Sequence, residues 1–420
     1  MASVSKNRNV NEKVVDQDYT FERVPSKARK SFFAMFFIML GFTFFSASMS
    51  VGAQLGNGLD LTGFILAVLI GGAILGAYTG ILGYIGSESG LSLDLLAQKS
   101  FGSKGSYLAS AMISFTQIGW FGVGIAMFAN PAAEVLGINP MILAVIAGIC
   151  MTSSAYFGIK GMEIVSYVSV PLIAILGVYS MVTASAAGGG LEAIFAKSAG
   201  GISLFTGVGM VMGSFVSGGT ATPNFTRFAK DNWTAVLTTV IAFFIGNTLM
   251  FAFGAVGGAF TGKDDIFYVM MAQGLTVPAL IVLGANIWTT ADNGLYTTGL
   301  GLSNITKFRK KPMVLLSGVL GTLTSFWLYN NFIGWLSFLN ATLPPVGAII
   351  MFDFFTRRDK YKPENVMEVD QVVNWGAVLG IIGGALVGNF VPWGISSINA
   401  MVVACLCYYL YSKFAGKKEA

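Results

Sequence analysis

The chain contains no histidine and only three cysteines, and charged residues make up only 11% of its 420 residues. Without histidine it lacks the commonest proton relay and the commonest metal ligand, and no serine nucleophile can be activated by a histidine. Cys150, Cys405 and Cys407 all fall within apolar segments and are odd in number, so we expect no disulfide framework. The sequence also lacks a Walker loop, an HExxH motif and a CxxC motif. These absences argue against an enzyme.

Hydrophobic residues, in contrast, make up 54% of the chain, and 53 residues are glycine. A helix needs about 20 apolar residues to cross a bilayer, and small residues let membrane helices pack closely. We predict twelve membrane spans, over residues 32–54, 61–86, 105–136, 139–157, 162–184, 201–219, 233–260, 275–302, 312–331, 332–352, 373–391 and 394–414. The sequence therefore predicts an all-α integral membrane protein with twelve transmembrane helices.

The basic residues are distributed unevenly between these spans. When the connecting segments are assigned alternately to the two sides of the membrane, with the N-terminal tail inside, all 25 Lys and Arg residues except Lys197 and Lys263 fall inside. The positive-inside rule predicts this bias and places both termini in the cytoplasm. Residues 1–30 and 415–420 are then cytoplasmic tails, and residues 1–30 contain no apolar segment typical of a cleaved signal peptide. The basic residues form no continuous face, so we expect no nucleic-acid partner.

Two spans are interrupted by small and hydroxyl residues near their centres. Span 1 contains such residues over 40–50, and span 6 contains GSFVSGGT over 213–220, followed by Pro223. Broken helices at membrane depth are the best sequence indication of a transporter binding site. Because the two spans are five apart, a second five-helix unit must enter the membrane from the opposite face. We therefore predict an inverted repeat of residues 31–184 (spans 1–5) and 201–352 (spans 6–10), with two additional helices in residues 373–414.

Polar residues also lie near the centres of spans 3 and 8, which correspond to each other in this scheme. Gln117 and Trp120 are three residues apart and share a helix face. In span 8 a polar stripe over residues 286–293 follows helical spacing. An isolated glutamine would most often be glue between helices, but a tryptophan one turn away adds a stacking surface. An amide beside an aromatic ring is the pair of groups that a planar heterocycle needs.

Other side chains near the two interruptions have both a functional and a structural interpretation. With 34 phenylalanines in the chain, Phe45 and Phe215 would by themselves be core or lipid-facing residues. Thr289 and Thr290 would ordinarily donate to carbonyls of their own helix, but opposite a broken span 1 they also suggest an oxygen-lined cation site. Asp292 is a functional candidate because it is an intramembrane carboxylate, and a structural bond to a neighbouring helix is about as plausible.

Taken together, these residues resemble the nucleobase–cation symporter family, and within it the bacterial cytosine permease branch. The strings that carry the resemblance are MLGFTFFSASM (39–49), TQIGWFGVGIAMFA (116–129), GSFVSGGT (213–220), NIWTTADNGLY (286–296), LYNNFIGWLSFL (328–339) and PPVGAII (344–350). The resemblance covers the chain from residue 25 onward. It implies the LeuT-type 5+5 inverted-repeat fold, with broken helices 1 and 6 and two extra C-terminal helices.

The resemblance also implies which residues bind the two ligands. For the base we expect Gln117, Trp120, Phe215, Ser217 and Asn286, joined by Phe45 and Ser214. For Na⁺, the coupling ion, we expect the carbonyls of Gly41, Phe44 and Asn286 and the hydroxyls of Thr289 and Thr290. Relatives that transport hydantoins carry tryptophan where this chain has Phe215, and the smaller ring favours a single pyrimidine.

The sequence thus predicts a secondary active symporter that imports cytosine with Na⁺, without a cofactor, in the bacterial cytoplasmic membrane. We expect it to function as a monomer. Uracil, purines, allantoin or hydantoins remain alternative substrates, and proton coupling through Asp292 remains an alternative to Na⁺. A passive channel for small polar solutes is the alternative from a different class, although channels tend to keep a continuous pore with short re-entrant loops.

Overall fold

The computed structural model describes residues 18–415, without the side chains of residues 160–162, 333, 336, 337 and 415. The predicted tails therefore lie largely outside the described residues, at 1–17 and 416–420. From residue 18 to residue 196 the helices are η1 (Ser26–Ala28), α1 (Phe32–Thr43), α2 (Ser46–Gly58), α3 (Leu61–Ser89), α4 (Leu93–Phe101), α5 (Ser106–Leu136), α6 (Pro140–Tyr156), α7 (Ile159–Gly188) and α8 (Leu191–Phe195). Within the described residues the β-type pairing is limited to one bridge between Lys30 and Ala229.

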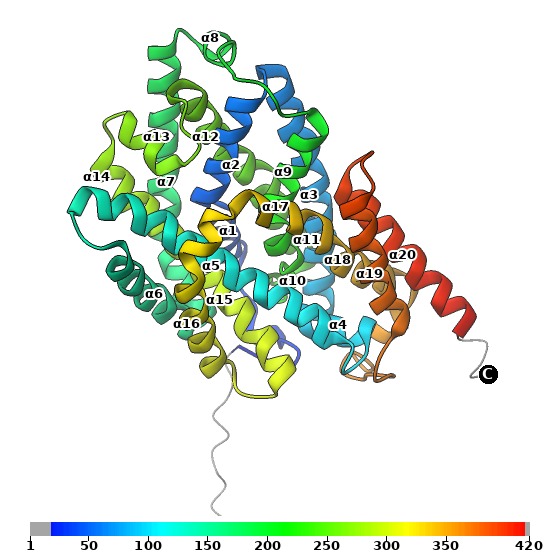
Figure 1. The fold of residues 1–420 in the computed structure, drawn as a ribbon. Helices are drawn as coiled ribbons and strands as arrows, with labels where there is room; N and C mark the ends of the chain where they lie inside the picture. Colours follow the sequence, from blue (N-terminus) through cyan, green and yellow to red (C-terminus); the bar gives the residue numbers. More distant parts are fainter. Residues whose placement is uncertain (1–17, 416–420) are drawn as a thin grey trace, which may run out of the picture.

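The second half of the chain is also helical. Its elements are α9 (Leu204–Thr220), α10 (Pro223–Thr226), α11 (Asn232–Val240), the π-helix η2 (Ile241–Gly246), α12 (Asn247–Thr261), α13 (Ile266–Ala272), α14 (Thr276–Pro278), the π-helix η3 (Ala279–Leu283), α15 (Gly284–Thr306), α16 (Lys310–Asn330), α17 (Phe332–Thr342), α18 (Pro344–Thr356), η4 (Arg358–Tyr361), α19 (Trp375–Phe390) and α20 (Ser396–Ala415). Figure 1 shows α19 and α20 side by side at one edge of the molecule, where they pack on each other and on α18.

Local sequence explains where several helices begin and end. At the start of α3 the side chain of Asp60 accepts a hydrogen bond from the N–H of Gly63, and Asn139 caps α6 in the same way. Pro140 occupies the first position of α6, where its missing N–H has no consequence. Gly90 ends α3 with a φ of 69°, a left-handed conformation that glycine adopts without a Cβ clash.

Each predicted span coincides with one helix or with consecutive helices. Within the described residues, seven helices are long and apolar enough to cross a membrane, or eight if α1 and α2 are one bent span. The apolar helices α6 and α19 are shorter than that limit. The structure therefore supports a multi-pass membrane protein, and the number of twelve crossings stays a prediction.

The predicted interruption of span 1 is confirmed. Helix α1 ends at Thr43 and α2 begins at Ser46, and their axes differ by 50°. Between them Phe45 is extended, with φ −127° and ψ 128°. The break leaves the last carbonyls of α1 and the first N–H groups of α2 without partners inside their own helices.

The interruption of span 6 lies later than predicted. Residues 213–220 were expected to form the break, but they belong to the continuous helix α9, which ends at Thr220 before α10 begins at Pro223. The glycines serve close packing instead. A Cβ on Gly218 would lie 2.7 Å from the ring of Phe42. Proline cannot continue the hydrogen-bond ladder of the preceding turn, which places the interruption at residues 221–222.

The helices pack as an inverted repeat requires. Spans 1–5 correspond to spans 6–10, so a contact between spans 1 and 7 should recur between spans 6 and 2. Helix α2 of span 1 packs along α12, and the corresponding helix α9 packs along α3. Likewise α1 contacts α7, α9 contacts α17, and the related helices α5 and α15 pack on each other at the centre. The predicted inverted-repeat fold is confirmed, whereas the limits 31–184 and 201–352 stay predictions.

Candidate functional site

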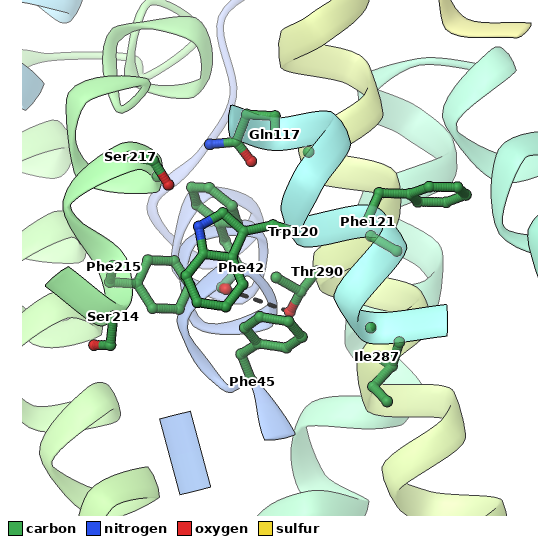
Figure 2. Close-up of a pocket in the computed structure, with 14 residues that line it drawn as sticks. Phe42, Phe45, Gln117, Trp120, Phe121, Ser214, Phe215, Ser217, Ile287 and Thr290 are labelled. Carbon is green, nitrogen blue, oxygen red and sulfur yellow. Dashed lines mark hydrogen bonds between the residues drawn. The ribbon is translucent and has the colours of Figure 1, made fainter. Parts of the chain in front are cut away.

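A small cavity of about 20 Å³ lies where the break in span 1 meets α5, α9 and α15 (Figure 2). Its lining is mostly aromatic and small: Phe42, Phe45, Gln117, Trp120, Phe121, Gly124, Ser214, Phe215, Ser217, Gly218, Ile287, Thr290, Ala291 and Gly294. Both halves of the chain contribute to this wall. The cavity is therefore located at the interface of the two repeats, where transporters of this architecture bind substrate.

Aromatic rings from three different spans line the cavity. The ring of Phe45 lies 5.8 Å from that of Trp120 and 6.2 Å from that of Phe215, in both cases edge-on. Phe42 contacts Phe215 at 5.3 Å. Such edge-to-face contacts are favourable for aromatic pairs and fix the orientation of each ring. A planar ligand would have to separate these rings in order to stack between them.

Two polar side chains of the cavity, Gln117 and Ser217, lie at one end, whereas Ser214 and Thr290 lie elsewhere on its wall. Figure 2 shows the amide of Gln117 and the hydroxyl of Ser217 turned toward each other there. The Nε2 atom of Gln117 is buried and makes no hydrogen bond within the described residues. An unpaired buried donor costs about 1–3 kcal/mol, so a ligand with an acceptor on its edge would remove this cost on binding.

The structure brings most of the predicted substrate-binding residues together. Gln117, Trp120, Phe215, Ser217, Phe45 and Ser214 all line the cavity. The hydroxyl of Ser214 donates to the carbonyl of Val211 at 2.8 Å, so its hydrogen is already used within α9. The roles assigned to these side chains stay predictions, whereas their convergence is now a structural observation.

Asn286 is placed differently from the expectation for a base-binding side chain. Its Oδ1 accepts hydrogen bonds of 2.8 Å from both the backbone N–H and the hydroxyl of Ser46, and its Nδ2 donates to the carbonyl of Phe44. The amide therefore binds both ends of the break in span 1 and does not line the cavity. Its partners are the groups that the break leaves unpaired, which explains why an amide is needed there.

Sequence reasoning did not single out several lining residues. Phe42 and Gly218 lie inside the quoted strings of spans 1 and 6, but neither is polar enough to be distinguished from ordinary core. Gly124 allows the side chain of Ile287 to approach, because a Cβ there would lie 3.0 Å from it. Gly294 likewise leaves room for Oε1 of Gln117. Only the spacing from Gln117 and Trp120 along the same helix could have indicated Gly124.

Four of the oxygens predicted to bind Na⁺ form two close pairs, and the fifth, the carbonyl of Phe44, accepts a hydrogen bond from the amide of Asn286. The hydroxyl of Thr290 lies 3.4 Å from the carbonyl of Gly41 and bridges α15 to the end of α1. The hydroxyl of Thr289 donates to the carbonyl of Asn286 at 2.7 Å, the bond to its own helix that was the structural alternative. All of these residues are buried. The groups that would bind the ion are uncharged oxygen atoms, and hard cations prefer oxygen ligands.

Two further residues, Asp292 and Phe332, lie outside the lining of the cavity. Asp292 is fully buried and does not line it. On the predicted outer side, the ring of Phe332 at the start of α17 packs edge-on against Trp120 at 5.8 Å. The partly buried ring of Phe332 thus packs against the cavity-lining Trp120 on that side.

Comparison with known proteins was made for the whole chain. A family model described as "Permease for cytosine/purines, uracil, thiamine, allantoin" matches residues 23–411. The cytosine permease of Escherichia coli (strain K12) is 46% identical over 407 residues, which cover 96% of this chain and 97% of that protein. The cytosine permease of Escherichia coli O157:H7 matches with the same values.

Solved structures share the fold at lower sequence identity. Mhp1, a nucleobase-cation-symport-1 family transporter, in a closed conformation with bromovinylhydantoin bound, has a TM-score of 0.76 and 18% identity, and the match covers 94% of this chain and 96% of that one. A Na⁺-coupled sialic acid symporter in a substrate-bound outward-open state has a TM-score of 0.69 and 13% identity, with coverage of 95% and 92%. At these identities the likeness concerns the architecture alone, and it agrees with the packing of the two repeats.

Proposed function

The chain belongs to the family of permeases for cytosine, purines, uracil, thiamine and allantoin, and we propose that it is a secondary active symporter that imports cytosine with Na⁺ across the bacterial cytoplasmic membrane. The family membership confirms the resemblance drawn from the sequence and makes the protein a transporter rather than an enzyme. The substrate, the coupling ion and the mechanism are the content of the proposal.

The unpaired amide of Gln117 beside an aromatic cavity is the observation that carries the choice of a nucleobase. Cytosine is planar, and its edge presents a ring-nitrogen acceptor next to an amino donor. Nε2 of Gln117 can donate to that acceptor, while the rings of Trp120 and Phe215 supply faces for stacking. The high identity to cytosine permeases supports cytosine among the bases of the family.

Na⁺ is supported by the oxygens at the break in span 1. The hydroxyl of Thr290 on α15 lies 3.4 Å from the carbonyl of Gly41 on α1. The carbonyl of Asn286 accepts a hydrogen bond from the hydroxyl of Thr289, the residue before Thr290. Binding there adds no titratable group to the cycle. Asp292 would be required for proton coupling, and it lies away from the cavity.

The break in span 1 offers a physical route for coupling. Phe44 would ligate the ion through its carbonyl, Phe45 lines the cavity, and Ser46 is held by Asn286. These three residues are consecutive, so an ion that fixes the carbonyl of Phe44 also fixes the ring of Phe45 against the substrate. Each ligand should then raise the affinity for the other. Alternating access around the cavity would convert this linkage into transport.

Uptake into proteoliposomes tests the proposal. With an inward Na⁺ gradient, labelled cytosine should accumulate above its concentration in the bath, and unlabelled cytosine should compete better than uracil, adenine, allantoin or hydantoin. Equilibration without accumulation would favour a passive channel. Stronger competition by another heterocycle would identify that compound as the substrate in place of cytosine. Accumulation driven only by a pH gradient would identify protons as the coupling ion in place of Na⁺.

A further inference from the structure

The path from the cavity toward the predicted cytoplasmic side is filled by a column of buried aromatic rings. Phe42 lines the cavity, and its ring lies 4.9 Å from that of Phe225, just beyond α9. Phe225 in turn lies 6.0 Å from Tyr296 of α15. All three side chains are almost completely buried. Substrate cannot leave in this direction unless the column separates.

The column ends at Arg227, which is fully buried. Its Nη2 donates to the hydroxyl of Tyr296 at 3.0 Å and to the carbonyl of Asp18 at 2.8 Å. Its Nη1 donates to the carbonyl of Tyr19 at 2.9 Å, and its Nε donates to the carbonyl of Asn224 at 3.1 Å. Two of the acceptors that hold this buried cation therefore come from the segment before span 1.

That segment, residues 18–30, is attached to several spans at once. The N–H of Val24 donates to the carbonyl of Gly90 at the end of α3, and Lys30 pairs with the backbone next to Ala229. The side chain of Lys30 also forms an ion pair of 2.5 Å with Glu163 of α7. What composition predicts to be a polar tail is thus, in its described part, a segment packed across the predicted cytoplasmic face.

Lys310 at the start of α16 completes the arrangement. It forms an ion pair with the carboxylate of Asp18, and its Nζ lies 4.3 Å from the ring centre of Tyr296. Tyr19 adopts a φ of 51°, which is unusual for a residue with a Cβ. A conformation of this kind persists where surrounding contacts impose it. Here these contacts include the bond from Arg227 to the carbonyl of Tyr19.

We propose that Asp18, Tyr19, Arg227, Tyr296 and Lys310 form an inner lock, in which Arg227 is the positioning residue that holds the cytoplasmic path closed. The inner lock ties the segment before span 1 to the ends of spans 6, 8 and 9. It must open for release into the cytoplasm and close for uptake from outside. This inference rests on the proposed alternating access, but on neither cytosine nor Na⁺.

The burial of Arg227 determines how the inner lock opens. If residues 18–19 moved away alone, the guanidinium would remain buried without two of its acceptors, which is costly for a charged group. Water must therefore enter as the segment leaves, and Tyr296 then loses its bond as well. The inner lock should behave as a two-state element, with partly open forms scarcely populated.

Thiol labelling measures the opening directly. Cys150, Cys405 and Cys407 are replaced by serine, and Thr222→Cys is introduced as the reporter. Thr222 is fully buried between α9 and α10, in the chain between the cavity-lining Gly218 and Arg227, and its hydroxyl makes no hydrogen bond within the described residues, so the substitution breaks none. A membrane-impermeant maleimide is then applied to inside-out and right-side-out vesicles, without cytosine.

Tyr296→Phe and Lys310→Gln should each speed labelling in inside-out vesicles by about tenfold, because each removes an interaction with a charged group. Labelling in right-side-out vesicles should not rise. Lys362→Gln is the matched control, since Lys362 pairs with Asp359 at an exposed position outside the inner lock. The double exchange Asp18→Lys with Lys310→Asp should return the rate toward that of the parent.

Unchanged labelling in variants that elute as folded protein would overturn the inner lock, as would an equal rise from both sides or in Lys362→Gln. Should Lys310→Gln not fold, Asp18→Asn removes the same ion pair from the surface segment and gives the same test. Rapid labelling of the parent from both sides would instead contradict alternating access. The two failures are therefore distinguishable.

Discussion

At the scale of single residues, Gln117 offers a ligand in the cavity a hydrogen-bond donor that the described residues leave unused. Nε2 of Gln117 is buried and has no hydrogen-bond partner in the part of the chain that the structure describes, while Oε1 lies beside the backbone at Gly294. Ser217 faces the same end. A polar group kept unpaired in a membrane protein at this depth is costly unless a ligand completes it. Recognition of the substrate should therefore depend on this amide more than on any other polar side chain.

We predict that Gln117→Ala lowers the affinity for cytosine by about 10- to 100-fold, as expected for one hydrogen bond in a buried site. Gln117→Glu should weaken binding as well, because it replaces the donor Nε2 by an acceptor of the same shape. Equilibrium binding of labelled cytosine to the purified variants measures both effects. Affinities equal to that of the parent would show that Gln117 only joins helices.

Stacking should be separable from edge recognition. Trp120→Ala should reduce cytosine affinity by about 10- to 100-fold, since a base–aromatic stack contributes roughly 1–3 kcal/mol. Trp120→Phe should retain part of the binding. Phe215→Trp should be tolerated or should shift preference among ring sizes. A competition panel on each variant is the measurement, and parent-like cytosine binding by Trp120→Ala would place the base elsewhere.

Residue chemistry predicted much of this site, with an instructive exception. Gln117 and Trp120 could be predicted to line one site because an amide and an aromatic ring three residues apart near the centre of a span share one helix face. Asn286 has the same signature, yet its amide binds the break in span 1. A broken helix leaves its own unpaired groups, and these compete with substrate for nearby amides. Sequence alone does not reveal which of the two an amide serves.

At the scale of helices, the two effects of glycine explain why the interruption of span 6 was predicted at the wrong residues. Glycines at 213, 218 and 219 of span 6 indicated a break, but α9 continues through them. Gly219 allows the side chain of Thr79 to approach, since a Cβ would lie 2.7 Å from it. Glycine both weakens a helix and permits close packing, and its position in the sequence does not distinguish these effects. Pro223 marked the interruption correctly because its effect on the backbone is unambiguous.

Helix α4 supplies a prediction about pH. Burial raises the pKa of the Asp94 carboxyl to about 6, although the hydrogen bond from Ser110 and the charge of Arg227 act in the opposite direction. A pKa higher in the folded than in the unfolded protein means that the folded state binds the additional proton. Stability should therefore fall by up to about 1.4 kcal/mol per unit as pH rises from about 4 to about 6, and then level off.

Asp94→Asn should remove this part of the pH dependence and raise the melting temperature at pH 7 to 8. The amide can still accept the bond from Ser110, so the packing of α4 on α5 should be kept. Melting curves of detergent-solubilised parent and variant between pH 4 and pH 8 provide the measurement. Parallel curves would mean that the carboxyl of Asp94 has the same proton affinity in both states.

At the scale of the whole molecule, the distribution of charge and the packing of the helices support a single architecture. The spacing of the two interrupted spans predicted an inverted relation between the two halves before any contact was known, and the contacts of α2 with α12 and of α9 with α3 obey it. Charge asymmetry is a property of the whole chain, and one missed span would scatter the basic residues over both sides, so the asymmetry and the number of spans support each other. The packing of residues 18–30 could not be predicted in this way, because a polar composition is equally compatible with a free tail.

Coupling is the prediction that involves the whole molecule. If Na⁺ binds at Gly41, Phe44, Asn286, Thr289 and Thr290, then Na⁺ should raise cytosine affinity, and cytosine should raise Na⁺ affinity by the same factor, about 5- to 150-fold. Thr289→Ala and Thr290→Val should reduce both factors together. Thr298→Val is the control, because Thr298 lies on the same helix and its hydroxyl donates to carbonyls away from the break.

Asp292→Asn distinguishes this scheme from proton coupling. It preserves the shape of the side chain and removes the titratable intramembrane carboxyl of span 8, so Na⁺-stimulated cytosine binding should remain largely intact. Binding titrations with each ligand, in the presence and absence of the other, measure the two factors independently. Cytosine uptake that is indifferent to Na⁺, follows a pH gradient and disappears in Asp292→Asn would assign the coupling to protons. The break in span 1 would then position Phe45 for the base without an ion, and the hydroxyls of Thr289 and Thr290 would serve only to join α15 to its surroundings.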